Sequence, residues 1–123
     1  MWKLLLLAGT GGFIGTCCRF LINRFFLIVI KTHLPLATFT INIIGCFIFG
    51  VLTGILVKTG HMNPRINALL IIGFCGGFTT FSTFTNESFV LGSNGELVAA
   101  FGYIFLSLII GLVALWLGLI ISR

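Results

Sequence analysis

The residues of this chain that could do chemistry are concentrated in the string GFCGGFTTFSTF, which occupies positions 73 to 84. Glycines are followed there by the hydroxyl pairs Thr79-Thr80 and Ser82-Thr83, which are poor helix formers in an otherwise apolar stretch. We therefore expect a helix to break near Thr79 to Ser82. A break inside an apolar span frees backbone carbonyls, and free carbonyls are natural ligands for a cation.

Two aromatic residues of the same string are spaced so that their rings lie on one side of a helix. Phe81 and Phe84 are three residues apart, so they project to one side of a helix that follows the break. Phenyl rings carry a positive edge, and ring edges together with hydroxyl and amide hydrogens can line a path for a small anion without a fixed cation. These features are consistent with an ion pore but do not identify the ion. A packed aromatic cluster explains the phenylalanines just as simply.

Polar residues also recur on one face of each of two other apolar stretches. Thr38 and Asn42 are four residues apart, and so are Tyr103 and Ser107. A serine or threonine hydroxyl can bond its own helix backbone. The Asn42 amide has two donor hydrogens and an acceptor oxygen, and a lipid-facing position would leave them without partners. We expect Asn42 to lie at a helix interface or along a polar lumen.

The elements that position these residues are membrane-spanning helices. The chain has 123 residues, of which seven are Lys or Arg and two are Asp or Glu; 59% are apolar, and the mean hydropathy is +1.24. A hydrocarbon core of about 30 Å needs about 20 apolar residues per helix. We expect an all-α integral membrane protein, a single transmembrane domain over 1–123, with spans at about 4–30, 36–57, 66–91 and 97–121.

The basic residues bear on how the chain inserts into a membrane. Four of them flank one membrane face, namely Lys3, Lys58, Arg65 and Arg123. Three lie toward the other face, namely Arg19, Arg24 and Lys31. An excess of Lys and Arg on one side directs insertion. Because four basic residues face three here, the distribution is nearly even and gives almost no direction. We expect insertion in both orientations and an antiparallel homodimer whose axis lies in the membrane plane. The alternative is that Arg19 lies too deep to count, which leaves a weak preference for cytoplasmic termini.

Glycines and cysteines have structural interpretations. The glycine pairs with the four-residue spacing that allows close helix packing are Gly11 and Gly15, Gly50 and Gly54, and Gly73 and Gly77. The cysteines form no CxxC pair and have no neighbouring His, so we interpret them as small buried apolar residues; they are Cys17, Cys18, Cys46 and Cys75. The apolar run after Lys3 could open a signal peptide, but it exceeds the usual length, so we expect the first helix to be retained.

Three segments resemble the Fluc (CrcB) family of fluoride channels. They are GFCGGFTTFSTF at 73–84, GGFIGTCCRF at 11–20 and TFTINIIGCFIFG at 38–50, and the similarity extends to the length and the four-helix layout. The resemblance implies a fluoride-selective channel that lets cytoplasmic fluoride leave passively down its electrochemical gradient. It also implies a dual-topology antiparallel homodimer with two pores and a structural sodium ion at its centre. Such a dimer would lie in the plasma membrane of a prokaryote, which is the inner membrane if the organism is Gram-negative.

The resemblance assigns pore roles by position. The residues that it implies along the pore are Asn42, Phe81, Phe84, Ser82, Thr83, Ser107 and Tyr103. In that assignment the edges of the two phenyl rings meet fluoride. The chain departs from the family pattern at Ala37, where glycine is common, and at Gly111, where some members have a hydroxyl. The second departure removes a hydroxyl from the far end of the row of polar side chains that the resemblance implies beside the phenyl rings.

The resemblance also matches one basic residue, two backbone carbonyls and one acidic residue of this chain. Arg19 resembles the basic residue that draws anions toward a vestibule. The backbone carbonyls of Gly76 and Thr79 match the positions that hold the central sodium, so that two subunits would supply four oxygens. Glu87 corresponds to an acidic position whose role the sequence does not define.

Other functional classes are less consistent with the residues. A small proton-coupled exporter of organic cations, of the small multidrug resistance type, has a similar length and layout but needs a carboxylate in its first span, whereas the acids here are Glu87 and Glu96. We expect no enzyme, because His33 and His61 lie in predicted loops without catalytic partners. We expect no nucleic-acid partner, because the basic residues form no stripe. A non-transporting membrane assembly protein has the same composition, and it would pass no ion after reconstitution.

Overall fold

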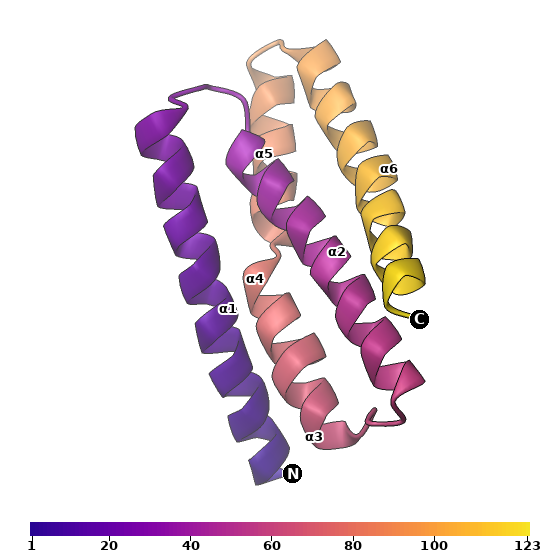
Figure 1. Ribbon diagram of the computed structural model, residues 1–123. Coiled ribbons are helices and arrows are strands. Elements are labelled where there is room, and N and C mark those ends of the chain that lie inside the picture. Colours follow the sequence, from indigo (N-terminus) through magenta and orange to yellow (C-terminus); the bar gives the residue numbers. More distant parts are fainter.

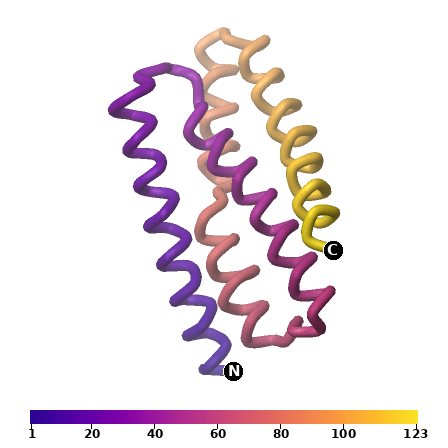
Figure 2. Tube along the Cα trace, viewed as in Figure 1, coloured from indigo at the N-terminus to yellow at the C-terminus, as the bar shows by residue number.

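The computed structural model describes residues Met1–Arg123 as a bundle of antiparallel helices (Figures 1 and 2). Its continuous long helices are α1 (Trp2–Val29), α2 (Leu36–Lys58) and α6 (Leu97–Ser122). The remaining long segment, Pro64–Ser93, is interrupted. All four segments are long and apolar enough to cross a membrane, which confirms the predicted architecture of four spans.

The third span breaks near its centre, as the sequence predicts. Its helix α4 (Gly76–Phe78) ends before Thr79, and α5 (Phe81–Ser93) begins after Thr80. Both threonines have extended backbones, with ψ of 160° at Thr79 and 115° at Thr80. The break follows from local chemistry, because a threonine at the N-cap position offers its side-chain oxygen to the next turn instead of continuing the helix.

The first half of the third span has a defined start and an unusual winding. The short helix α3 (Pro64–Ile66) begins after Asn63, whose Oδ1 accepts from the N–H groups of Arg65 and Ile66 at 3.0 and 3.1 Å. It leads into the π-helix η1 (Asn67–Cys75). Proline at the first helical position and asparagine before it are strong helix-start signals. A π-helical stretch is uncommon and occurs frequently near functional sites.

Close backbone contacts at glycines hold the spans together. A Cβ at Gly15 of α1 would meet the Phe74 carbonyl and would lie 2.8 Å from the Phe78 nitrogen. A Cβ at Gly50 of α2 would meet the Leu115 carbonyl of α6 and would lie 3.0 Å from the Leu119 nitrogen. Both distances are too short for a side chain, so these glycines allow backbones to pack directly, as predicted.

The connections place both chain ends at one end of the bundle (Figure 1). Each of the three connections between spans contains a residue with positive φ, namely Lys31 at 46°, Gly60 at 68° and Gly95 at 83°. A left-handed residue after a helix turns the chain sharply and lets the next helix run back. In the same view, α1 and α6 lie on opposite sides of α2 and the broken span (Figure 1).

The expectation that all four cysteines are buried is wrong. Cys75 is buried, but Cys17 is exposed and Cys18 and Cys46 are half-buried; all four are free thiols. Cys17 lies on α1, whose outer face also exposes apolar side chains such as Phe13 at 70% and Phe20 at 62%. A cysteine is accommodated there because lipid, not water, surrounds such a face.

Candidate functional site

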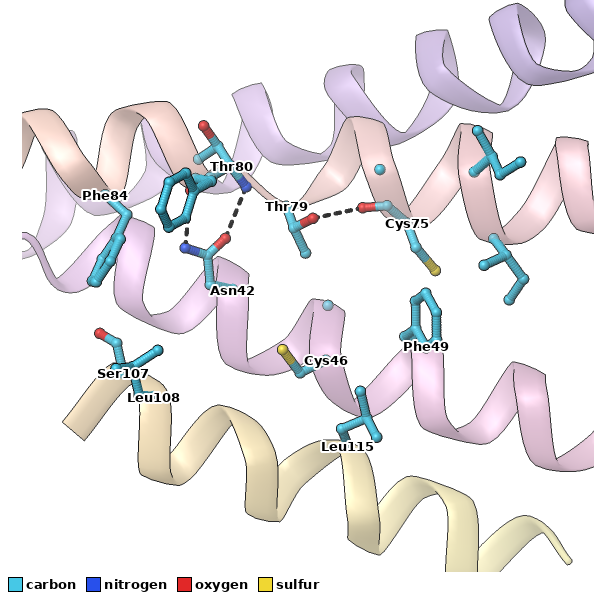
Figure 3. A pocket seen from close by; sticks show the side chains of 15 residues that line it. Asn42, Cys46, Phe49, Cys75, Thr79, Thr80, Phe84, Ser107, Leu108 and Leu115 are labelled. Atoms are coloured by element: carbon cyan, nitrogen blue, oxygen red, sulfur yellow. Dashed lines mark hydrogen bonds between the residues drawn. The ribbon is translucent and has the colours of Figure 1, made fainter. Parts of the chain in front are cut away.

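The side chain of Asn42 on α2 lies opposite the break in the third span (Figure 3). Its Oδ1 accepts from the Thr80 N–H at 2.9 Å, and its Nδ2 donates to the Thr80 carbonyl at 3.1 Å. Both backbone groups of Thr80 therefore have partners at membrane depth, where unpaired groups are costly. Nδ2 carries a second hydrogen that these two bonds leave available.

Two carbonyls near the break lose their usual helical donors. In an unbroken α-helix, the Thr80 N–H would bond the Gly76 carbonyl and the Thr83 N–H would bond the Thr79 carbonyl. Here the Thr80 N–H bonds Asn42, and the Thr83 N–H donates to Thr80 Oγ1 at 3.4 Å. The carbonyl oxygens of Gly76 and Thr79 are thus free to bind another group.

A cavity of about 490 Å³ lies beside the break (Figure 3). Its walls come from α2, η1, α4, α5, α6 and the break itself. The predicted site residues that line it are Asn42, Gly76, Thr79, Phe81, Phe84 and Ser107. No charged residue lines the cavity. Its polar groups are neutral hydrogen-bonding groups, and apolar residues such as Ile71 and Leu115 form much of the remaining wall.

The other predicted site residues lie outside the cavity wall. Ser82 is exposed on the first turn of α5. The Thr83 hydroxyl accepts from the Thr80 hydroxyl at 3.0 Å. Arg19 is half-buried on α1, and Tyr103 is buried on α6. The sequence pattern therefore predicted a single site, whereas the structure places some of its residues on the cavity wall and others around it.

Aromatic rings form a row from the surface into the bundle. The ring centroids of Phe81 and Phe84 are 5.9 Å apart with an interplanar angle of 42°, and those of Phe84 and Tyr103 are 5.1 Å apart at 59°. Both pairs are tilted, and neither is the face-to-face sandwich that the ring quadrupole disfavours. Phe81, at the outer end, is 79% exposed in the single chain. Its ring therefore faces away from the rest of the chain, toward the lipid or a partner molecule on this side.

The sequence pattern of the family described as CrcB-like protein, Camphor Resistance (CrcB), matches residues 6–119. The chain belongs to this family. The resemblance that the sequence motifs indicated is thereby confirmed.

Relatives of this CrcB chain match it over nearly their whole length. A protein of Flavobacterium psychrophilum is 42% identical over 113 residues, which cover 92% of this chain and 91% of the relative. One of Azobacteroides pseudotrichonymphae is 38% identical over 123 residues, 100% of this chain and 98% of the relative. One of Methylobacillus flagellatus is 43% identical over 119 residues, 96% and 92% respectively. Each is named "Fluoride-specific ion channel FluC". Together with the four spans, these relatives make this CrcB chain a multi-pass membrane protein of a prokaryote.

Glu87 is a site residue for which sequence reasoning found no role. In this CrcB chain, the Thr38 hydroxyl donates to Glu87 Oε1 at 2.8 Å, and the Tyr103 hydroxyl donates to Oε2 at 2.9 Å. Glu87 thereby joins α2, α5 and α6 about one helical turn from Asn42 and Ser107. A signal was present in the sequence, because Thr38 precedes Asn42 by one helical turn, as Tyr103 precedes Ser107.

The oxygens beside the break that could bind a metal ion are neutral. No cluster of three or more His, Cys, Asp or Glu side chains is arranged to hold a metal ion. The free Gly76 and Thr79 carbonyls remain, and carbonyl oxygen is a ligand suited to a hard cation such as sodium. One chain supplies only part of a coordination shell from these two positions.

Proposed function

We propose that this chain forms a fluoride-selective channel that exports cytoplasmic fluoride passively, and that it is not an enzyme. The observation that carries the proposal is the uncharged cavity in which Asn42, Ser107, Phe81 and Phe84 meet beside the helix break. The relatives named as fluoride channels support the choice of ion.

Neutral donors suit the transport of a strongly hydrated anion. A pore must replace the hydration shell of fluoride and still let the ion leave. The free Nδ2 hydrogen of Asn42, the Ser107 hydroxyl and the positive edges of the Phe81 and Phe84 rings supply several weak sites. A lysine or arginine at this depth would hold the ion too strongly. A narrow aromatic passage disfavours the larger chloride ion.

The functional unit in this proposal is an antiparallel homodimer with two pores. The exposed Phe81 ring supports it, because a second copy would cover that ring and close the cavity on its open side. The even distribution of basic residues between the two ends of the bundle supports insertion in both orientations.

A sodium ion at the dimer centre belongs to the same proposal. The Gly76 and Thr79 carbonyls of two copies would give four oxygens around a site close to the two-fold axis. The loss of their helical donors supports this role, since free carbonyls at membrane depth need a partner. The ion would join the subunits and hold the breaks in place.

The remaining predicted residues have supporting roles in the proposal. Ser82 and Thr83 would add hydroxyls beside the Phe81 ring, and Tyr103 would border the path through its contact with Phe84. Arg19 would attract anions toward the vestibule. The location would be the plasma membrane, which is the inner membrane if the organism is Gram-negative.

Efflux from liposomes that contain the purified protein tests the function. Fluoride and chloride electrodes run side by side should record rapid fluoride loss without chloride loss. Phe81→Ile removes the ring edge while keeping an apolar side chain, and it should abolish fluoride efflux. Phe13→Ile is the matched control, because Phe13 is 70% exposed on α1, away from the cavity wall. Wild-type liposomes that retain both anions would refute the proposal.

A further inference from the structure

Only two side-chain polar atoms in the chain are buried without a hydrogen-bond partner, the hydroxyl oxygens of Ser107 on α6 and Thr53 on α2. Several other hydroxyls, in helices or directly after them, donate to the carbonyl four residues back; they are Thr10, Thr59, Thr79, Thr85, Ser88 and Ser122. An unpartnered hydroxyl is costly at membrane depth, where water does not relieve it. Ser107 lines the cavity, so a small rotation of its hydroxyl would direct it to an occupant there. Thr53 is not part of the cavity wall, so the cavity does not account for its free hydroxyl.

Thr53 stands on the face of α2 that forms the cavity wall. That wall includes Asn42, Cys46 and Phe49 from α2, and Figure 3 shows the Phe49 side chain directed toward the broken span. Thr53 follows Phe49 by one helical turn and Asn42 by three, so it lies on the same face. It is about 16 Å farther along the axis than Asn42. From Asn42, α2 runs toward the end of the bundle that holds both chain termini (Figure 1).

The next two turns of the opposing helix offer no donor. One and two turns beyond Ser107, α6 carries Gly111 and Leu115, and neither has a side-chain hydrogen-bond donor. Farther along α6, the Ser122 hydroxyl is already engaged, since it donates to the Gly118 carbonyl at 2.7 Å. On α2, the Thr53 hydroxyl has no partner, so it can continue the line of donors that starts at Asn42 and Ser107.

We propose that the Thr53 hydroxyl is a second binding station for the transported anion, between the cavity and the membrane face that holds the chain termini. This inference rests on the proposed channel function. The Phe49 ring separates the Thr53 station from the first one at Asn42 and Ser107. Threonine in a helix occupies two χ1 rotamers, so the hydroxyl can turn between its buried position and the path. A single neutral donor holds an anion weakly enough for release.

Three variants test the station in the liposome efflux assay. Thr53→Val removes the hydroxyl at nearly constant shape and should slow fluoride efflux about tenfold, the loss of one hydrogen bond in the path. Thr53→Ser keeps the hydroxyl and should retain efflux close to the wild type. Thr40→Val is the matched control, because Thr40 is on the opposite side of α2 from Asn42 and should leave efflux unchanged.

Thermal unfolding separates this role from a structural one. If the Thr53 hydroxyl has no partner, Thr53→Val should leave the unfolding midpoint unchanged or raise it. A lowered midpoint would mean that the hydroxyl bonds a protein group, for example in a second copy, and would overturn the inference. Wild-type rates in Thr53→Val would overturn it as well, while the proposed channel function would stand. A wild type that passes no fluoride would refute both.

Discussion

Asn42 on α2 and Thr80 in the break of the third span are joined by two hydrogen bonds, of 2.9 and 3.1 Å. The amide side chain replaces the helical partners that the Thr80 backbone lacks. The same side chain lines the cavity. Asn42 therefore has a structural and a proposed ion-binding role at once, and substitutions can separate them.

Asn42→Ala should lower stability, because it leaves the Thr80 N–H and carbonyl without partners. The expected loss is about 2 kcal/mol or more, since each unsatisfied buried group costs about 1 to 3 kcal/mol. The thermal unfolding midpoint in detergent measures it. Asn42→Asp still accepts from the Thr80 N–H but sets a carboxylate oxygen against the Thr80 carbonyl, so it should also be destabilised. Its negative charge should block fluoride efflux by repulsion. An Asn42→Ala variant as stable as the wild type would contradict the structural role.

Phe84→Leu should reduce fluoride efflux at least tenfold by our estimate, because it removes the ring edge between Phe81 and Tyr103. Leucine keeps an apolar side chain, so the unfolding midpoint should fall only slightly. Phe13→Leu, on the exposed face of α1, serves as the control and should conduct normally. Equal efflux from the two variants would remove Phe84 from the proposed path.

Glu87 should contribute to the stability of the helix bundle through both of its hydrogen bonds. A double-mutant cycle with Thr38→Val and Glu87→Ala should give a coupling energy of about 1 kcal/mol, as expected for one intramolecular hydrogen bond. Tyr103→Phe with Glu87→Ala should give a coupling of similar size. The free energy of unfolding is the measured quantity. Additive effects in both cycles would show that the carboxylate does not link the three helices.

Gly15→Ala should destabilise the bundle, because the added Cβ would press on the backbone at Phe74 and Phe78. Gly9→Ala on the same helix is the control, since no atom lies within 4 Å of its Cβ position. It should be neutral or more stable by about 0.5 to 1 kcal/mol, as alanine favours helix. Comparison of the two unfolding midpoints measures the effect. Equal shifts would show that α1 does not pack on η1 and α4 through Gly15.

Removal of sodium should weaken the proposed dimer. With sodium replaced by N-methylglucamine, the Gly76 and Thr79 carbonyls would lose the ion that compensates for their missing helical donors. Size-exclusion chromatography at falling protein concentration should then show earlier dissociation than in sodium. The control is replacement of chloride by gluconate at constant sodium. An equal effect of both exchanges would point to a nonspecific effect of ion replacement and would contradict a sodium site.

Much of this protein was predictable from its sequence, because the deciding forces act locally. Long apolar runs must be helical in a membrane, since only helices satisfy their own backbone there, and the four spans follow. The break at Thr79 and Thr80 also depends on neighbouring residues, which favour capping over helix continuation. Close packing at Gly15 and Gly50 was predictable from spacing alone.

Other features depend on residues that are distant in the chain. Asn42 meets Thr80 across 38 positions, and Thr38 meets Glu87 across 49. A spacing rule places a side chain on a helix face, but only the packing of that face decides its partner. The exposure of Cys17 and the separation of Tyr103 and Arg19 from the cavity wall were decided in the same way. Sequence therefore determined which segments span the membrane and where one breaks, because those are local backbone energies. Tertiary structure decided which polar groups meet, because that depends on the relative positions of separate helices.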